Sequence, residues 1–285
     1  MEIKASQVKE LRDMSGVAMM ECKRALVECE GDLEKALDLL RSNSSLKAEK
    51  KSSRVAADGV IRIVSSDSYA TIIEINSETD FAAKDPGFIA FADDVVNYVS
   101  NNKVDDISMF ASTQIEEKRL ALIQKIGENI QLRRMETIEF DNSMSVGSYM
   151  HSDGKLATLV VTSNSDDNLA KDVAMHVAAS NPLCKTPDDI DSEVLEREKA
   201  IFEVQAKESG KDDEIMSKMV EGKVRKFLAE VSLTSQAFIK DPDMTVGKLL
   251  SDNGADVTEY VRFKVGEGIE VETKSFADEV ADQLK

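Results

Sequence analysis

Residues 59–75 read GVIRIVSSDSYATIIEI, and this stretch decides the fold class. Apolar side chains dominate on both sides of the short polar segment at residues 65–67, which is the pattern of two strands joined by a turn. Residues 88–99 and 114–126 then change to the three- and four-residue spacing of helices, and residues 130–136 return to a strand pattern. A hairpin followed by helices and a strand predicts an α+β protein.

The hairpin pattern occurs a second time. Residues 147–161 read GSYMHSDGKLATLVV, and a helical pattern follows from about residue 168 to residue 180. When Ala70 is aligned with Ala157, the Ala-Lys-Asp triplet at 83–85 falls opposite the Ala-Lys-Asp triplet at 170–172 without a gap. This agreement predicts two related hairpin-plus-helix units produced by duplication.

One position in the two units differs in an informative way. In the same alignment, Phe81 of the Thr-Asp-Phe triplet lies opposite Asn168, and both lie in a strand-to-helix loop. A fold that accepts a polar residue in one copy does not require an aromatic residue in the other, so Phe81 is a candidate anchor for a partner. The alternative is that Phe81 folds back onto its own helix, and these residues alone leave both interpretations open.

The first 57 residues differ in charge from the remainder. They hold 11 Lys+Arg and 10 Asp+Glu, a net of +1, whereas the remainder holds 25 and 44, a net of −19. This difference predicts a separate N-terminal module. Its apolar spacing indicates three short helices, with Ser6 and Ser15 as expected caps, an end at residues 42–45, and a linker or linker helix at residues 47–54. Such a module has a ubiquitin-associated-type architecture, which usually binds another protein.

Residues 181–229 form a helical insertion that follows the second hairpin-plus-helix unit. Their apolar spacing predicts a hairpin of two helices with a seam like that of a coiled coil. Two interpretations are open, because the helices either only pack on each other or also form an arm for self-association. A strand is expected at residues 257–265 and a short helix at residues 277–284. The seam positions are Ile190, Val194, Ile201 and Val204 on the first helix and Met216, Val220, Val224, Phe227 and Val231 on the second.

Composition excludes several classes of protein. The net charge is 36 − 54 = −18, and a strongly acidic surface repels the phosphates of nucleic acids. No apolar run approaches the roughly 18 residues of a membrane span, and the first residues lack the apolar segment of a signal peptide. The cysteines, Cys22, Cys29 and Cys184, form no Cys-x-x-Cys pair. We therefore expect reduced thiols, a cytoplasmic location, and neither a membrane nor a nucleic-acid partner.

The chain carries little that indicates catalytic chemistry. It has no phosphate-binding loop of the Walker type, and Gly266-Glu267-Gly268 lacks the third glycine of a dinucleotide fingerprint. His151 follows a strand and is expected to be exposed, whereas His176 lies in an apolar helix and is favoured as a buried residue rather than a catalytic one. We expect a binding protein without bond chemistry and without a cofactor.

Several long stretches resemble signatures of the bacterial translation elongation factor Ts family. They are residues 11–26 (LRDMSGVAMMECKRAL), 74–84 (EINSETDFAAK), 125–129 (KIGEN), 174–179 and 230–238. The resemblance runs through the whole chain in order. Ala18 and Ala82 depart from the glycine and the valine that the family usually has at these two positions.

The resemblance implies a guanine-nucleotide exchange factor for elongation factor Tu, which it would bind in the GDP-bound and the nucleotide-free states. It also implies a domain order that agrees with the N-terminal module, the two hairpin-plus-helix units and the helical hairpin predicted above. The expected parts are a ubiquitin-associated-like docking domain with its linker (1–55), a first core subdomain (56–140), a second core subdomain (141–180 and 230–264), the coiled-coil hairpin (181–229) and a C-terminal helical module (265–285).

The resemblance also implies which residues contact the partner. Phe81 would insert between helices of the partner and disturb its Mg²⁺ site, and His151 would lie near the partner's phosphate loop. Lys240 departs from the apolar residue expected after Ile239. The implied contact residues are Arg12, Met19, Met20, Lys23, Asp80, Phe81, Ile126, Gly127, His151 and Ile239.

Two other classes of function compete with this interpretation. A non-catalytic adaptor would use the N-terminal module to bind peptides or ubiquitin-like proteins, but it would not need an exposed phenylalanine at position 81. A metabolic enzyme with an acidic site would need a nucleophile, a metal cluster or a phosphate loop, and the sequence shows none of their signatures.

Overall fold

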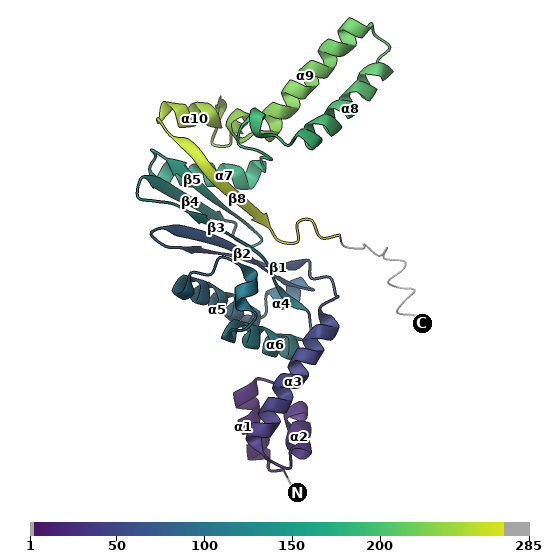
Figure 1. Ribbon diagram of the computed structural model, residues 1–285, viewed down its shortest axis with the longest axis vertical. Helices are drawn as coiled ribbons and strands as arrows, with labels where there is room; N and C mark the ends of the chain where they lie inside the picture. Colours follow the sequence, from purple (N-terminus) through teal and green to yellow (C-terminus); the bar gives the residue numbers. More distant parts are fainter. Residues whose placement is uncertain (1–2, 271–285) are drawn as a thin grey trace.

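The computed structural model describes residues 3–270, so the helix expected at residues 277–284 lies outside the described residues. Two sheets stack on each other in the middle of the body, with helices covering the outer face of each (Figure 1). Mixed helices and antiparallel sheets confirm the α+β prediction. None of the helices in residues 3–270 combines the length and apolar character needed to cross a bilayer.

The first unit is a three-stranded antiparallel sheet with helices on one face. Ile73 and Ile75 point to these helices and pack there with Phe88 and Phe91. The helices include the predicted segment 114–126, which begins and ends where the apolar spacing places it. The strands are β1 (Asp58–Ser65), β2 (Tyr69–Ser77) and β3 (Ile130–Glu139), in the order β1-β2-β3, and the helices are α4 (Asp80–Ala83), α5 (Pro86–Asn102), the 3₁₀ turn Ile107–Phe110 and α6 (Gln114–Ile126).

The second unit repeats this plan with the strand order β4-β5-β8. Its central helix packs directly on the sheet, since a Cβ atom at Gly147 would lie only 2.1 Å from the backbone of Ala170. Only glycine permits this approach. The elements are β4 (Met144–Met150), β5 (Leu156–Ser163), α7 (Asp167–Ser180), the 3₁₀ turns Pro187–Asp189 and Leu233–Ser235, β6 (Ala237–Phe238), β7 (Asp241–Thr245), α10 (Val246–Asp252) and β8 (Asp256–Lys264).

Both units begin their first helix in the same way. Thr79 caps α4 by accepting a hydrogen bond from Ala82 N–H, and Asp166 caps α7 by accepting one from Leu169 N–H. These pairs are the ones that the ungapped alignment places opposite each other. The units differ afterwards, because Pro86 cannot continue a helix, so the first unit has the short α4 followed by α5 whereas α7 is continuous.

A single buried carboxylate connects the two units. Glu74 lies on β2 with its side chain fully buried between the sheets. Its Oε1 accepts hydrogen bonds from Arg133 Nη1 (2.9 Å) and from Gly266 N–H (2.8 Å), and its Oε2 accepts one from Arg134 Nε (2.6 Å). Burial opposes ionisation, but the three donors outweigh it and lower the pKa of Glu74. The apolar residues around it, including Ile72, Leu159 and Phe263, form the core between the sheets.

Residues 5–51 form a three-helix head with its own small core around Leu11 and Leu26. Two predicted caps are wrong. The first helix begins one residue before Ser6, where the Gln7 side chain accepts the Lys4 N–H, and Ser15 is the last residue of that helix rather than a cap of the next. The helices are α1 (Ala5–Ser15), α2 (Met19–Glu28) and α3 (Leu33–Lys51).

Helix α3 joins the head to the body. The predicted end at residues 42–45 is wrong, because the serines in this segment do not interrupt the helix. Ser44 donates its hydroxyl proton to the carbonyl of Leu40 one turn earlier, at 2.8 Å. The helix continues to Lys51, so most of the basic stretch 47–54 is the helical form of the predicted linker.

Helices α8 (Ser192–Glu208) and α9 (Asp213–Val231) form an antiparallel arm that projects from the second unit (Figure 1). The α9 seam residues are half-buried as predicted, but the α8 seam is wrong. Ala206 is buried and Phe202 packs edge-on against Phe227, whereas Val194, Ile201 and Val204 are exposed. The face of α8 that meets α9 is therefore rotated from the predicted face. Self-association through the arm stays a prediction.

Candidate partner-binding surface

Phe81 is the second residue of the short helix α4, which closely follows β2; the segment 78–83 is called the Phe81 loop below. The Thr79 hydroxyl accepts the Ala82 N–H at 3.2 Å and starts a helix of only four residues. Ala82 and Ala83 are buried beneath it, while the side chain of Phe81 is 83% exposed. The alternative that Phe81 folds back onto its own helix is therefore wrong. An exposed aromatic ring on a fixed loop is suited to insertion into a partner.

Asp80, the neighbour of Phe81, is paired within its own helix. Its carboxylate accepts a hydrogen bond from Lys84 Nζ at 2.6 Å. This hydrogen bond lowers the pKa of Asp80, and the more distant ammonium of Lys155 adds to the effect. Asp80 is therefore ionised at neutral pH and would have to exchange Lys84 for a donor on a partner.

The structure brings Ile126 and Gly127 to the Phe81 loop. Helix α6 ends at Ile126, and Gly127 follows with a φ of 89°, which turns the chain toward Thr79. The next residue, Glu128, accepts hydrogen bonds from the backbone N–H and the hydroxyl of Thr79. Glu128 lies within the family signature at residues 125–129, but the resemblance implied no role for it.

His151 lies on the turn between β4 and β5, and this turn packs against the first unit. The Gly154 carbonyl accepts the Ile61 N–H at 2.8 Å, and Lys155 Nζ is 2.7 Å from a carboxylate oxygen of Asp58. The His151 ring is about half-exposed, with Nδ1 3.0 Å from Asp153 Oδ1. Asp58 pairs across the sheet with Ser77, two residues before Thr79, so this turn and the Phe81 loop lie at the same end of the first sheet.

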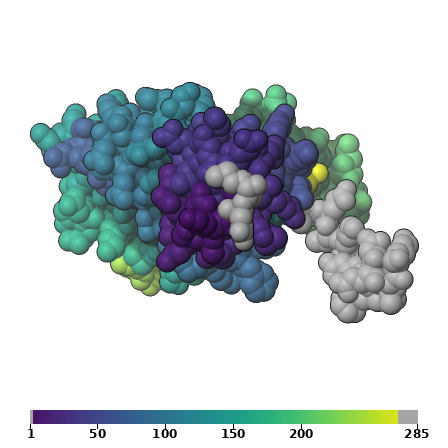
Figure 2. All heavy atoms as spheres, turned by 90° about the horizontal axis from the view of Figure 1, so that it is seen from below, coloured from purple at the N-terminus to yellow at the C-terminus, as the bar shows by residue number. Residues whose placement is uncertain are grey.

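The four predicted head residues, Arg12, Met19, Met20 and Lys23, are exposed on α1 and α2. Figure 2 looks at the molecule from below and shows the head in front of the body. A polar contact attaches it there, because Gln124 on α6 donates a hydrogen bond to Glu21 on α2, which also pairs with Lys47 Nζ on α3 within the head. The side chains of Met19 and Met20 are flexible and polarisable, which suits a surface that binds another protein.

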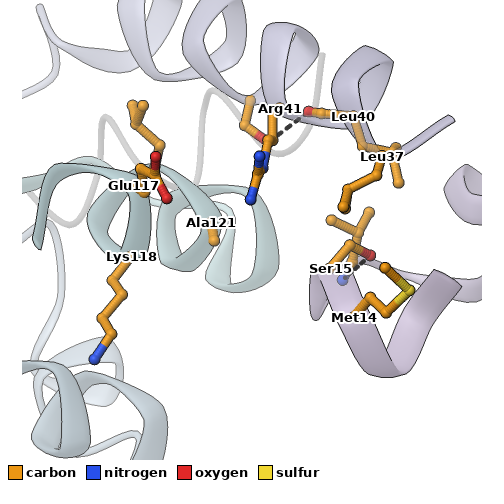
Figure 3. A pocket seen from close by; sticks show the side chains of 11 residues that line it. Met14, Ser15, Leu37, Leu40, Arg41, Glu117, Lys118 and Ala121 are labelled. Carbon is orange, nitrogen blue, oxygen red and sulfur yellow. Dashed lines mark hydrogen bonds between the residues drawn. The ribbon is translucent and has the colours of Figure 1, made fainter. Parts of the chain in front are cut away.

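A cleft separates the head from α6 on one side of α3 (Figure 3). Its volume is about 300 Å³, and its walls include Met14, Leu37 and Leu40 from the head and Lys118 and Ala121 from α6. The predicted contact residues do not line it. The cleft is therefore not part of the candidate surface.

Ile239 lies apart from the other predicted residues. It is half-exposed between β6 and β7 in the second unit, and its N–H donates to Nδ1 of His176 on α7 at 3.2 Å. Figure 1 shows α10, which packs on β6 and β7, and helix α4 on opposite sides of the stacked sheets. Lys240 next to it is paired with Asp172 at 2.6 Å, so the departure from an apolar residue is accommodated by an ion pair.

His176 is fully buried, as the apolar helix predicts. Its Nε2 lies 2.9 Å from Gln236 Oε1, so with Nδ1 accepting from Ile239 the ring is neutral and carries its proton on Nε2. Burial lowers the pKa of His176 below its ordinary value of 6.5. A neutral histidine that links α7 to the loop before β7 is a structural group rather than a catalytic one.

This burial predicts a pH dependence of stability. Below about pH 6.5 the unfolded chain binds a proton at His176 that the folded chain does not. The free energy of unfolding therefore decreases as the pH is lowered, by at most about 1.4 kcal/mol per pH unit. Denaturant midpoints at pH 7.5 and pH 5.5 measure the loss. His176→Asn keeps an acceptor for Ile239 N–H and should remove most of the dependence. An equal loss in the variant would show that another group is responsible.

No group of three or more His, Cys, Asp or Glu side chains within residues 3–270 is placed to hold a metal ion. The chemistry of the surface is therefore that of its side chains: an exposed aromatic ring, an ionised carboxylate, a histidine paired with an aspartate, and a flexible methionine pair on the head. Such a surface can bind and displace parts of another protein.

Comparison with known proteins identifies the family. The family model described as elongation factor TS matches residues 78–267. An elongation factor Ts from Hahella chejuensis is 51% identical over 285 residues, which cover 99% of each chain. Those from Saccharophagus degradans and Teredinibacter turnerae are 49% and 47% identical, each over 100% of this chain and 98% of the relative. The chain belongs to the elongation factor Ts family.

Proposed function

We propose that this translation elongation factor is a guanine-nucleotide exchange factor that binds elongation factor Tu and promotes release of GDP, so that GTP can rebind. The observation that carries the proposal is the exposure of Phe81, which is 83% accessible on a scaffold whose second copy has Asn168 at the same place. A ring that the fold does not use is available for a partner.

The proposed activity needs no bond chemistry. A GTPase holds GDP through Mg²⁺ and through backbone N–H groups around the phosphates. A protein that binds the nucleotide-free form more tightly than the GDP form weakens GDP binding by the same factor, because the two binding equilibria are linked. The chain would therefore act as a binding protein in the cytoplasm, without a cofactor and without being an enzyme in the strict sense.

The candidate surface supplies the parts that such a mechanism requires. Phe81 is the wedge that would enter between helices of the GTPase and displace the elements that support Mg²⁺. Asp80 beside it is ionised and would accept hydrogen bonds from a helix terminus or compete for a donor there. Ile126, Gly127 and His151 would broaden the contact, and the head would hold the partner in place through Met19 and Met20.

The proposal is tested with purified elongation factor Tu loaded with a fluorescent GDP analogue. The chain is added at one-tenth of the concentration of the GTPase, with an excess of unlabelled GDP, and the release of fluorescence is followed. We expect all of the labelled GDP to leave at an accelerated rate, because each molecule of the chain acts repeatedly. An unchanged release rate at equimolar concentration would contradict the proposal.

The same experiment separates exchange from simple adaptor activity. The exposed methionines of the head would also suit an adaptor, which binds its partner without changing nucleotide affinity. Stable binding of elongation factor Tu together with unaccelerated GDP release would favour the adaptor. Acceleration that disappears when residues 1–54 are removed, and returns at high concentration, would assign docking to the head and exchange to the body.

A further inference from the structure

The direction of the Phe81 ring is not set by packing of the ring itself. Phe81 is 83% exposed, and helix α4 has only four residues, a length that is unstable in isolation. The ring is therefore positioned through the backbone of α4. The end of this helix is anchored by the buried Ala82 and Ala83, and its start is held by polar contacts, among them those of the N–H and the hydroxyl of Thr79.

Both groups of Thr79 bind one carboxylate from a distant part of the chain. Thr79 N–H donates to Glu128 Oε2 at 3.0 Å, and Thr79 Oγ1 donates to Glu128 Oε1 at 2.7 Å. A hydroxyl has one proton to donate, so giving it to Glu128 leaves an oxygen lone pair for Ala82 N–H, which lies 3.2 Å away. Glu128 therefore orients the capping hydroxyl as well as the backbone.

Glu128 is held by a reciprocal contact. Glu78, which precedes Thr79, accepts the backbone N–H of Asn129 at 2.6 Å. The Asn129 side chain is buried and donates to the carbonyl of Arg54 at 2.9 Å. Each loop thus supplies a carboxylate to the backbone of the other, and the pair is attached to the segment that leaves α3. Charge-assisted bonds of this kind are about twice as strong as neutral ones.

We infer that Glu128 is a positioning residue, which fixes the cap of α4 and thereby the direction in which Phe81 leaves the surface. This inference rests on the proposed function, because it treats Phe81 as the anchor. Glu128 would act on exchange only through Thr79 and Phe81, and it would need no contact with the GTPase.

Double variants test this inference. Glu128→Ala should slow GDP release by about tenfold, the equivalent of roughly 1.4 kcal/mol. Glu128→Gln should recover most of the rate, because its amide oxygen can accept Thr79 N–H while its amide nitrogen donates to the Thr79 hydroxyl oxygen. In a Phe81→Ala background, Glu128→Ala should change the rate by less than about twofold. A full tenfold loss in that background would show that Glu128 contacts the partner itself and would overturn the inference.

Amide hydrogen exchange in the free chain gives a readout that does not depend on activity. Glu128→Ala should speed exchange at residues 79–83 without changing the melting temperature by more than a degree or two. Unchanged exchange rates in this segment would sink the inference even if the activity fell. If the wild-type chain failed to release GDP, the proposed function would fail while this measurement still tested the link between Glu128 and Thr79.

Glu139 provides the matched control. It lies at the far end of β3, where its neighbour across the sheet is Tyr69, and it forms an exposed pair with Lys103. Glu139→Ala removes a carboxylate from the opposite end of β3 without touching the Phe81 loop. It should leave both GDP release and hydrogen exchange at residues 79–83 unchanged. If Glu139→Ala slowed GDP release as much as Glu128→Ala does, the slowing would be explained by a general loss of negative charge. That result would contradict a positioning role for Glu128.

Discussion

Replacing Phe81 with alanine is expected to slow GDP release from elongation factor Tu by roughly 30- to 1000-fold while leaving the stability of the free chain unchanged. Truncation of a central aromatic anchor typically costs about 2–4 kcal/mol of binding, and here the cost would fall on the nucleotide-free complex. The free chain loses nothing, because the ring is 83% exposed and packs on no core residue. Ile126 and His151 can reduce the effect if they share the contact.

The measurement compares GDP release and melting temperature for the same preparations. Asn168→Phe is the matched control, because it places the same ring at the equivalent position of the second unit, where the native side chain is also exposed. That variant should keep the wild-type exchange rate and should not gain a second exchange site. A drop of several degrees in the melting temperature of Phe81→Ala, with unchanged catalysis per folded molecule, would make Phe81 structural and refute the wedge.

Replacing Glu74 with alanine is expected to destabilise the folded chain by about 3 kcal/mol, the lower end of the cost of breaking a buried ion pair. The lower end applies because Arg133 and Arg134 keep some access to water, with 21% and 31% of their side chains exposed. The Gly266 N–H loses its acceptor at the same time. The two sheets would then lose their buried polar contact, while the polar contacts between the β4–β5 turn and β1 would remain, and unfolding should become less cooperative.

Urea unfolding at pH 7 measures this loss, with Glu139→Ala as a control whose exposed ion pair contributes about 0–1 kcal/mol. Acid should reveal the same group. The folded-state pKa of Glu74 is lowered from its ordinary value of 4.5, so its contribution is complete above that value and is lost as pH falls through the folded pKa. Glu74→Gln should therefore flatten the acid limb of the stability curve. An unchanged acid limb and an unchanged midpoint would show that Glu74 is not the connection.

Local patterns predicted the elements whose causes are local. Helix α6 begins at Gln114 and ends at Ile126, as its spacing indicates, because Thr113 caps the start and Gly127 permits the left-handed turn at the end. The alignment of the two hairpins likewise placed Thr79 opposite Asp166, and both are caps. Helix lengths and repeated spacings of this kind depend on neighbouring residues, whereas the exact caps of the head helices, expected at Ser6 and Ser15, were wrong.

The errors arose where a distant contact overrides a local preference. The serines of residues 42–45 have the appearance of a helix end, but α3 continues because Ala48 and the turns beyond it pack against the first unit. The seam of α8 was assigned to Val194 and Ile201, since apolar spacing alone does not say which face meets α9. The short strands β6 and β7 and helix α10 were missed, because segments of two to seven residues carry little periodic signal.

The sequence by itself indicated the α+β class, the family, and the agreement between the two hairpin-plus-helix units that singles out Phe81, because each of these depends on residue order and on short-range spacing. Only the tertiary structure decided which acidic residues matter. Among 54 Asp and Glu residues, nothing in the sequence separates Glu74 and Glu128 from carboxylates on a solvated surface. Stacking of the sheets brings the Gly266 N–H to Glu74, and the turn after α6 brings Glu128 to Thr79. A carboxylate takes its role from the donors that surround it, and those donors lie 192 and 49 residues away along the chain.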